Sequence, residues 1–180
     1  VGHNGVVVID EGRPTPSDPI LLTIEDRSKF TVRVPDWLFE FISDLKNLAN
    51  CLVLVVDAKV DYRTLLPILE YAKRANQPLL LACEGLDDTA PELLVTNVRQ
   101  KTITALPIFL HGYGKNRHDE YWDLATITGA RCFGLSDTLS AAKLESNAFG
   151  LASEVHLGSN ELFIRAPDNV HREELAKRLQ

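Results

Sequence analysis

The middle of the chain alternates between short apolar runs and longer amphipathic stretches. Three runs are largely apolar and have the length of buried strands: residues 51–56, 78–83 and 102–110. Three stretches carry apolar residues at spacings of three and four, as helices do: residues 65–75, 89–99 and 117–128. Strands that alternate with helices in this way predict an α/β fold, with a parallel sheet that is covered on both faces.

The N-terminal third has a different pattern. Residues 5–10, 20–24 and 30–34 are short apolar segments separated by turn residues, which predicts strands. From Trp37 to Leu48 the apolar positions recur at helical spacing, which predicts a helix.

The C-terminal part predicts a hairpin followed by a helix. The segments 154–157 and 161–165 flank a turn at Gly158, and the charged run 170–180 predicts a terminal helix. We therefore expect a layered α/β domain with a central parallel or mixed sheet, flanking helices and a β-rich N-terminal part.

Composition and charge exclude several classes of protein. Apolar residues make up 45% and charged residues 24% of the 180 residues, as in globular proteins. The net charge of −6 without a basic stripe argues against nucleic-acid binding, and no apolar stretch approaches the length of a membrane span. The three cysteines are far apart in the sequence, which predicts reduced thiols in the core. The chain opens on Val1 and contains no methionine, so we expect it to be a piece of a longer protein.

Residues that could carry chemistry are few. Asp57 and Glu84 each follow an apolar strand, where a Mg²⁺-dependent or phosphoacceptor enzyme would place carboxylates; the same residues also serve to cap loops. Gly112 to Lys115 lie between a strand and a helix but match no nucleotide-binding motif, which favours a tight turn. His111 and His118 lack an evident third metal ligand. We expect no catalytic, cofactor-binding or metal-binding residue in this chain.

Two of the predicted helices have more apolar surface than one sheet contact needs. In the first helix Leu65 and Ile68 belong to a stripe that suffices to pack on a sheet, and Leu66 and Leu69 form a second stripe. In the second helix the apolar run Leu93 to Val95 covers more than half of the circumference. Either these residues form a broad core interface, or they line a groove for apolar segments of a partner chain.

The sequence of these helices resembles the apical domain of group I chaperonins, the GroEL family. Leu66 to Glu70, followed by Gln77 to Leu81, is similar to the family's LPVLE and KPLLI. Gly112 to Arg117, leading to Asp123 to Gly129, is similar to its GFGDRR and DIATLTGG. The two motifs are specific in combination.

Weaker similarities extend the resemblance toward both ends of the chain. Val1 to Val6 resembles the family's VGKEGVI, and Lys143 to Glu145 with Gly150 fits its KATLEDLG. The match covers the chain except for about residues 13–50. Lys115 and Asn116 depart from the family's aspartate in GFGDRR, which suggests an outlying viral or organellar lineage.

The resemblance implies a binding site for polypeptides rather than a catalytic centre. In that family the two helices hold non-native polypeptides and, alternately, the lid co-chaperonin. The residues that the resemblance assigns to the polypeptide-binding surface are Leu66, Leu69, Leu93, Leu94, Val95, Trp37, Phe41 and Ile42. The last three stand for the family's aromatic YLSPYF segment.

The resemblance also implies what lies outside this chain. The full-length parent would be a protein-folding ATPase that uses ATP and Mg and forms a homo-oligomeric ring. The fragment lacks the family's GDGTT phosphate-binding motif, so it would bind no cofactor, and it would be monomeric. Its partners would be non-native polypeptides and a lid co-chaperonin, with no nucleic acid and no membrane.

The resemblance divides the chain into three parts and points to a compartment. Residues 1–12 would end the hinge segment of an intermediate domain, 13–157 would form the apical domain, and 158–180 would lead back to the intermediate domain. We expect a cytoplasmic location, in a bacterium or an infected host, or an organellar matrix. Two other classes stay open: an enzyme domain that uses Asp57 and Glu84, and a structural domain whose apolar helix faces meet a fixed subunit.

Overall fold

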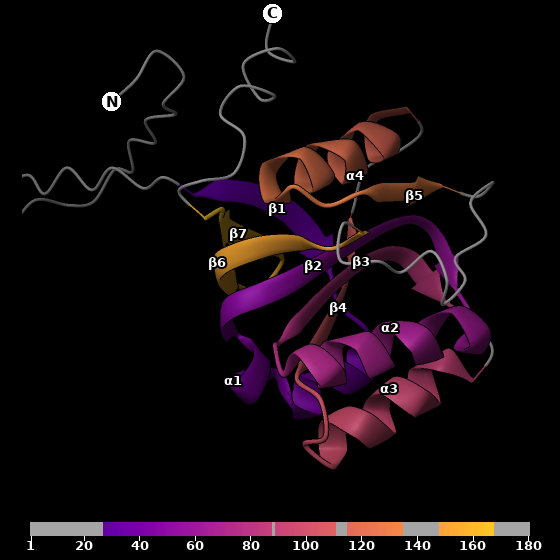
Figure 1. Ribbon diagram of the computed structural model, residues 1–180. Coiled ribbons are helices and arrows are strands. Elements are labelled where there is room, and N and C mark those ends of the chain that lie inside the picture. Colours follow the sequence, from indigo (N-terminus) through magenta and orange to yellow (C-terminus); the bar gives the residue numbers. More distant parts are fainter. Residues whose placement is uncertain (1–26, 88, 111–114, 135–147, 168–180) are drawn as a thin grey trace, which may run out of the picture.

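A computed structural model describes residues 27–87, 89–110, 115–134 and 148–167 (Figure 1). The strands are β1 Ser28–Arg33, β2 Asn47–Val60, β3 Leu79–Leu86, β4 Ala105–Leu110, β5 Cys132–Gly134, β6 Gly150–Leu157 and β7 Glu161–Arg165. The helices are the 3₁₀ helix η1 Asp36–Glu40, α1 Ile42–Leu45, α2 Tyr62–Ala75, α3 Ala90–Arg99 and α4 Lys115–Thr128. No helix in these ranges combines the length and the apolar character that a membrane span requires.

The described strands form one mixed sheet that closes on itself. Its order is β3-β4-β1-β7-β6-β2-β5, and β3 also pairs with β2. Six strands therefore form a ring, and β5 extends from β2 outside it. The pairs that join β2, β3 and β4, and the pair of β2 with β5, are parallel, whereas the other pairs are antiparallel. The mixed sheet with flanking helices confirms the expected fold class.

β2 is the central strand of this sheet. Its first half pairs with β6, its second half with β5, and its other edge pairs with β3. The residues from Cys51 to Val56 are all buried, because helices and strands cover both faces of the strand. This explains why the segment is continuously apolar instead of alternating.

The helices pack on this sheet in two groups. In Figure 1, α4 lies above the sheet, and α2 and α3 lie below it. Asp61 caps the N-terminus of α2, because its carboxylate accepts a hydrogen bond from the Thr64 amide at 2.9 Å. The hydrogen bonds from Thr64 hold the pKa of the Asp61 carboxyl below its ordinary value. The helix ends at Asn76, whose left-handed backbone (φ 51°) is typical of a helix C-terminus.

The predicted helix from Trp37 to Leu48 is largely wrong. The segment forms η1 and the short α1, and β2 has already begun at Asn47. Leu48 pairs with Val155 of β6, so a sheet contact overrides the helical spacing of the apolar residues. The predicted strands 5–10 and 20–24 and the terminal helix 170–180 lie outside the described residues.

The predicted hairpin is confirmed, and it belongs to the same sheet as the rest of the domain. β6 and β7 pair antiparallel from Glu154 with Arg165 to Leu157 with Leu162. β7 then pairs with β1. The boundary expected between residues 157 and 158 thus falls within a hairpin whose two strands share one sheet.

Gly150 allows the start of β6 to approach the end of α4. A Cβ atom at this position would lie 2.5 Å from the Thr128 carbonyl oxygen and 2.6 Å from the Ala130 amide nitrogen. Both are backbone atoms, which a side-chain rotation cannot move away. A side chain at position 150 therefore requires α4 and β6 to separate.

We predict that Gly150→Ala destabilises the fold by about 2 kcal/mol or more, because overpacking against backbone forces the two elements apart. Gly134→Ala is the matched control, since a Cβ atom there meets nothing within 4 Å and the glycine does not have a positive φ. Urea unfolding of both variants measures the difference. Equal midpoints for the two variants would contradict the close approach at Gly150.

Candidate functional site

An exposed apolar stripe runs along the first half of α2. The side chain of Leu66 is 36% exposed and that of Tyr62, one turn earlier, is 40% exposed. Residues four apart lie on the same side of a helix, so the two side chains are neighbours. Tyr71 lies on another side of the helix, where its ring stacks on Phe149 at a centroid distance of 4.3 Å. The part of the second stripe that contains Leu66 is therefore accessible to a partner.

Leu69 and Leu94 are buried, so the expectation that they line an open groove is wrong. Leu69 is only 2% exposed, because it lies four residues after Leu65 and three before Ala72, within the stripe that packs on the sheet. Leu94 lies four residues from both Ala90 and Val98, which form the buried side of α3. Both leucines are core residues in this structure.

The two other apolar residues of α3 are at the margin of the core. Leu93 and Val95 are half-buried, and Leu93 packs against the core cluster. The side chain of Asn97 donates a hydrogen bond to the Leu93 carbonyl oxygen at 2.8 Å. Leu93 and Val95 thus keep apolar surface that a partner can cover.

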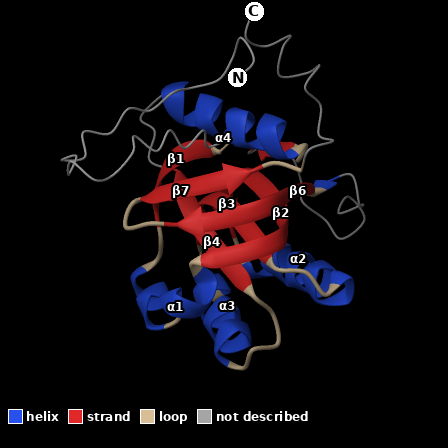
Figure 2. Ribbon diagram, turned by 90° about the vertical axis from the view of Figure 1, so that its left-hand side faces the viewer, coloured by secondary structure: helices blue, strands red, loops and turns tan. Residues whose placement is uncertain are grey.

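The aromatic segment of η1 lies on the other side of α3. Figure 2 shows α3 between α1 and α2. The Arg99 guanidinium of α3 lies 3.5 Å from the Glu40 carboxylate and 5.8 Å from the centroid of the Phe41 ring. Trp37 and Phe41 are half-buried and pack against the core. The predicted residues therefore form two apolar surfaces that α3 separates, rather than one groove.

Phe39 is an exposed apolar residue that the sequence did not predict as part of the site. Its side chain is 58% exposed, more than any other large apolar side chain among the described residues. It stands between Leu38, which is buried, and Glu40 in η1. In the predicted helix, Phe39 lies outside the apolar stripe. A large apolar residue outside such a stripe is the signal that could have identified Phe39 as exposed. Ile42 is also a predicted site residue, but its side chain is not among those that the structure describes.

Asp57 holds α4 against the sheet. Its carboxylate is buried on β2, and its Oδ2 atom contacts Nδ1 of His118 in α4. Tyr121, one turn further along α4, donates a hydrogen bond to the Cys83 carbonyl oxygen of β3 at 2.7 Å. Asp57 thus joins α4 to β2, and Tyr121 joins the same helix to β3.

The surroundings of Asp57 do not assemble a metal centre from the described residues. Glu84 follows Cys83, which pairs with Val56, so the two predicted carboxylates lie at neighbouring positions of β2 and β3. Among the residues placed by the structure, no three His, Cys, Asp or Glu side chains converge as ligands. His111 lies outside the description.

The cysteines behave as core residues. Cys51 and Cys83 are buried, and burial raises the pKa of each thiol to about 12. Since the thiolate is the reactive form, both side chains are inert at neutral pH. Cys132 is half-buried on β5.

Comparisons with curated proteins identify relatives of one kind. The β-1 subunit of the RuBisCO large subunit-binding protein of Chlamydomonas reinhardtii is 30% identical over 86% of this chain. The chloroplastic α subunit from the same alga is 27% identical over 99% of the chain. A mitochondrial chaperonin CPN60-like protein of Arabidopsis thaliana is 27% identical over 91%. The chain spans only 36%, 31% and 29% of the lengths of these relatives.

The fold is also that of a solved chaperonin. Two crystal forms of the chaperonin gp146 from bacteriophage EL (Pseudomonas aeruginosa) superpose with TM-scores of 0.58 and 0.60. The sequence identities are 16% and 15%, over 84% and 85% of this chain. No protein-family model matches the chain. The relatives thus include chloroplast and mitochondrial proteins, and the two superposed structures are those of a bacteriophage protein. The enzyme alternative based on Asp57 and Glu84 is not favoured.

Proposed function

Because this chain is a divergent chaperonin domain, we propose that it captures non-native polypeptides as the apical domain of an ATP-dependent ring chaperonin. The observation that carries the proposal is the exposed stripe of Leu66 and Tyr62 on α2, beside α3. Leu93 and Val95, which flank buried Leu94 on the two margins of α3, add partly exposed apolar surface. Phe39, with Trp37 and Phe41, supplies a second apolar surface on the far side of α3.

The chemistry of capture is non-covalent. Apolar side chains of a client lose their contact with water when they cover these residues, which gains about 25 cal/mol per Å². Because this gain has no direction, many different client sequences satisfy it. Part of it is offset by the cost of ordering the client, so a surface of a few exposed residues binds weakly on its own. A ring that presents several such surfaces to one client raises the effective affinity.

We further propose how this domain fits its parent protein. The parts of the parent outside this chain form the ring and hold ATP and Mg, whereas the 180-residue chain by itself is monomeric. A lid co-chaperonin shares the α2 surface with clients. Residues 1–12 and the segment after β7 link the domain to the rest of the parent, which works in a bacterial or infected-host cytoplasm or in an organellar matrix.

We predict that Leu66→Ser weakens binding of an uncharged fluorescent peptide built of Leu, Ser and Gln by about tenfold, because central apolar residues dominate such contacts. The variant should keep its stability within about 1 kcal/mol, since the substituted side chain is exposed. Fluorescence anisotropy and urea unfolding of the same preparation measure both quantities.

Two further variants make this test specific. Leu151→Ser on β6, where the leucine is 42% exposed, should leave peptide binding unchanged. Leu69→Ser should lower the urea midpoint strongly, by about 2–5 kcal/mol of stability, because it opens a cavity in the core. Unchanged peptide binding by Leu66→Ser, or equal loss in Leu151→Ser, would contradict the proposed surface.

The ATP site of the parent lies outside this chain in our proposal. The segment from Gly112 to Lys115 matches neither common phosphate-binding motif, and the sequence contains no GDGTT. We predict that isothermal titration of the chain with ATP and Mg²⁺ gives no binding heat. A site of micromolar affinity would contradict the proposal and support an enzyme that uses Asp57 and Glu84.

A further inference from the structure

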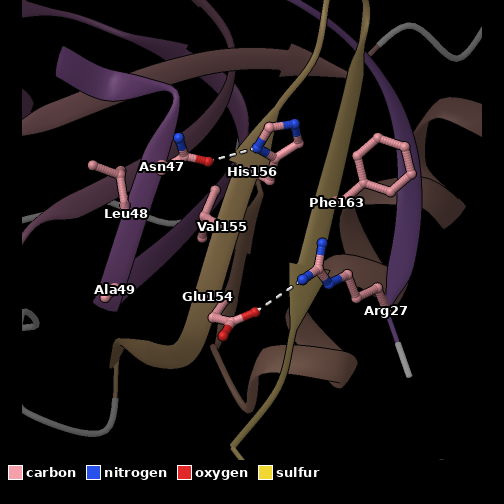
Figure 3. Close-up of a pocket in the computed structure, with 8 residues that line it drawn as sticks. All are labelled: Arg27, Asn47, Leu48, Ala49, Glu154, Val155, His156 and Phe163. Atoms are coloured by element: carbon pink, nitrogen blue, oxygen red, sulfur yellow. Dashed lines mark hydrogen bonds and ion pairs between the residues drawn. The ribbon is translucent and has the colours of Figure 1, made fainter. Parts of the chain in front are cut away.

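A pocket of about 270 Å³ opens on the face that β2, β6, β7 and the residue before β1 form, and none of its lining residues belongs to α2 or α3 (Figure 3). Leu48 and Val155 are buried beneath it, and Phe163 and His156 stand at its side. Arg27 and Glu154 lie at its other side. The pocket thus joins an aromatic wall to a pair of opposite charges.

One row of side chains crosses four strands at this pocket. The sheet register aligns Lys29 with Phe163, Phe163 with His156, and His156 with Asn47. The ammonium nitrogen of Lys29 lies 5.9 Å from the centroid of the Phe163 ring, and the His156 ring lies 6.1 Å from it on the other side. Nδ1 of His156 donates a hydrogen bond to Oδ1 of Asn47 at 2.6 Å. These contacts hold the row in place and leave its polar ends at the surface.

The same face carries more positive than negative charge. The Glu154 carboxylate forms ion pairs with the guanidinium groups of Arg27 and Arg165, at N–O distances of 3.2 Å and 3.7 Å. The Glu161 carboxylate forms one with the Lys29 ammonium group at 2.6 Å. Arg33 lies on the same side of β1 as Lys29, because the residues between them alternate between buried and exposed. Among the described residues, four cations therefore lie on the side of the sheet that carries two carboxylates, in a chain whose net charge is −6.

The face is open in the described part of the chain. Figure 2 looks onto β7 and its neighbours, and no described helix lies in front of them. The side chains of Arg27, Glu154 and Arg165 are between a third and a half exposed, so their ion pairs are solvent-screened and contribute little to stability. An incoming carboxylate can therefore replace Glu154 at small cost.

We propose that this face binds an extended acidic polypeptide segment, which lies along the row and places one carboxylate against Arg27 and Arg165. The positive excess supplies the attraction, and the ring of Phe163 supplies an apolar platform for the stem of the bound side chain. The site is separate from the α2 surface, so it does not depend on the function proposed above.

The test uses the 180-residue chain and a fluorescent peptide of alternating Glu and Ser residues. We expect this peptide to bind, and to bind more weakly as salt is raised, because salt screens exposed charges. Arg27→Gln and Arg165→Gln should each weaken binding about three- to fivefold. The matched control Lys73→Gln removes one positive charge from the exposed side of α2 and should leave binding unchanged. Thermal unfolding of each variant checks that the fold is retained.

Four outcomes would overturn the proposal. The first is that a peptide in which Gln replaces Glu binds as tightly as the acidic peptide. The second is that Lys73→Gln weakens binding as much as Arg27→Gln or Arg165→Gln does. The third is loss of acidic-peptide binding in Leu66→Ser, which would place the peptide on the α2 surface instead. The fourth is self-association of the chain that Arg27→Gln abolishes, which would make a second copy the occupant.

Discussion

The pairing of β2 with three other strands is the constraint on which the rest of this structure depends. Fourteen residues from Asn47 to Val60 contact β6 and β5 along one edge and β3 along the other. Through β3 and β6 the sheet closes on itself, so β2 connects its parallel and antiparallel halves. Because both faces of the strand are covered, its central residues must be apolar, and a polar group among them needs a partner. The Oδ2 atom of Asp57 meets this requirement through His118, which fixes α4 on the sheet, whereas Oδ1 is buried without a hydrogen-bond partner among the described residues.

This arrangement also decides which side chains of the helices remain for a partner. Helix α2 follows directly from β2 and presses Leu65, Ile68, Leu69 and Ala72 onto the sheet. Leu66 then points away from the sheet as a consequence of the helical repeat. On α3, Ala90, Leu94 and Val98 have the buried positions, which leaves Leu93 and Val95 at the margins. The apolar surface available to clients thus consists of the helix side chains that do not pack in the core.

The alternation of apolar runs and amphipathic stretches was sufficient to predict the α/β class, the three parallel strands and the helices between them. It was also sufficient to predict an apolar excess on α2 and α3. It could not divide that excess into core and surface, because Leu66 and Leu69 are only three positions apart and belong to overlapping stripes. Only the orientation of α2 on the sheet, which depends on contacts distant in sequence, assigns Leu69 to the core. The helix predicted around Trp37 failed for the same reason, since Leu48 is held by its pairing with Val155.

Photo-crosslinking can detect whether α2 captures a non-native polypeptide. A benzophenone amino acid is placed at position 66 or, as a control of similar exposure, at position 151 of β6. Each variant is illuminated with a chemically unfolded model protein and with the same protein in its native state. Capture at α2 predicts crosslinks from position 66 to the unfolded protein only, and few or none from position 151. Equal crosslinking from both positions, or none from position 66, would contradict capture of non-native polypeptides at α2.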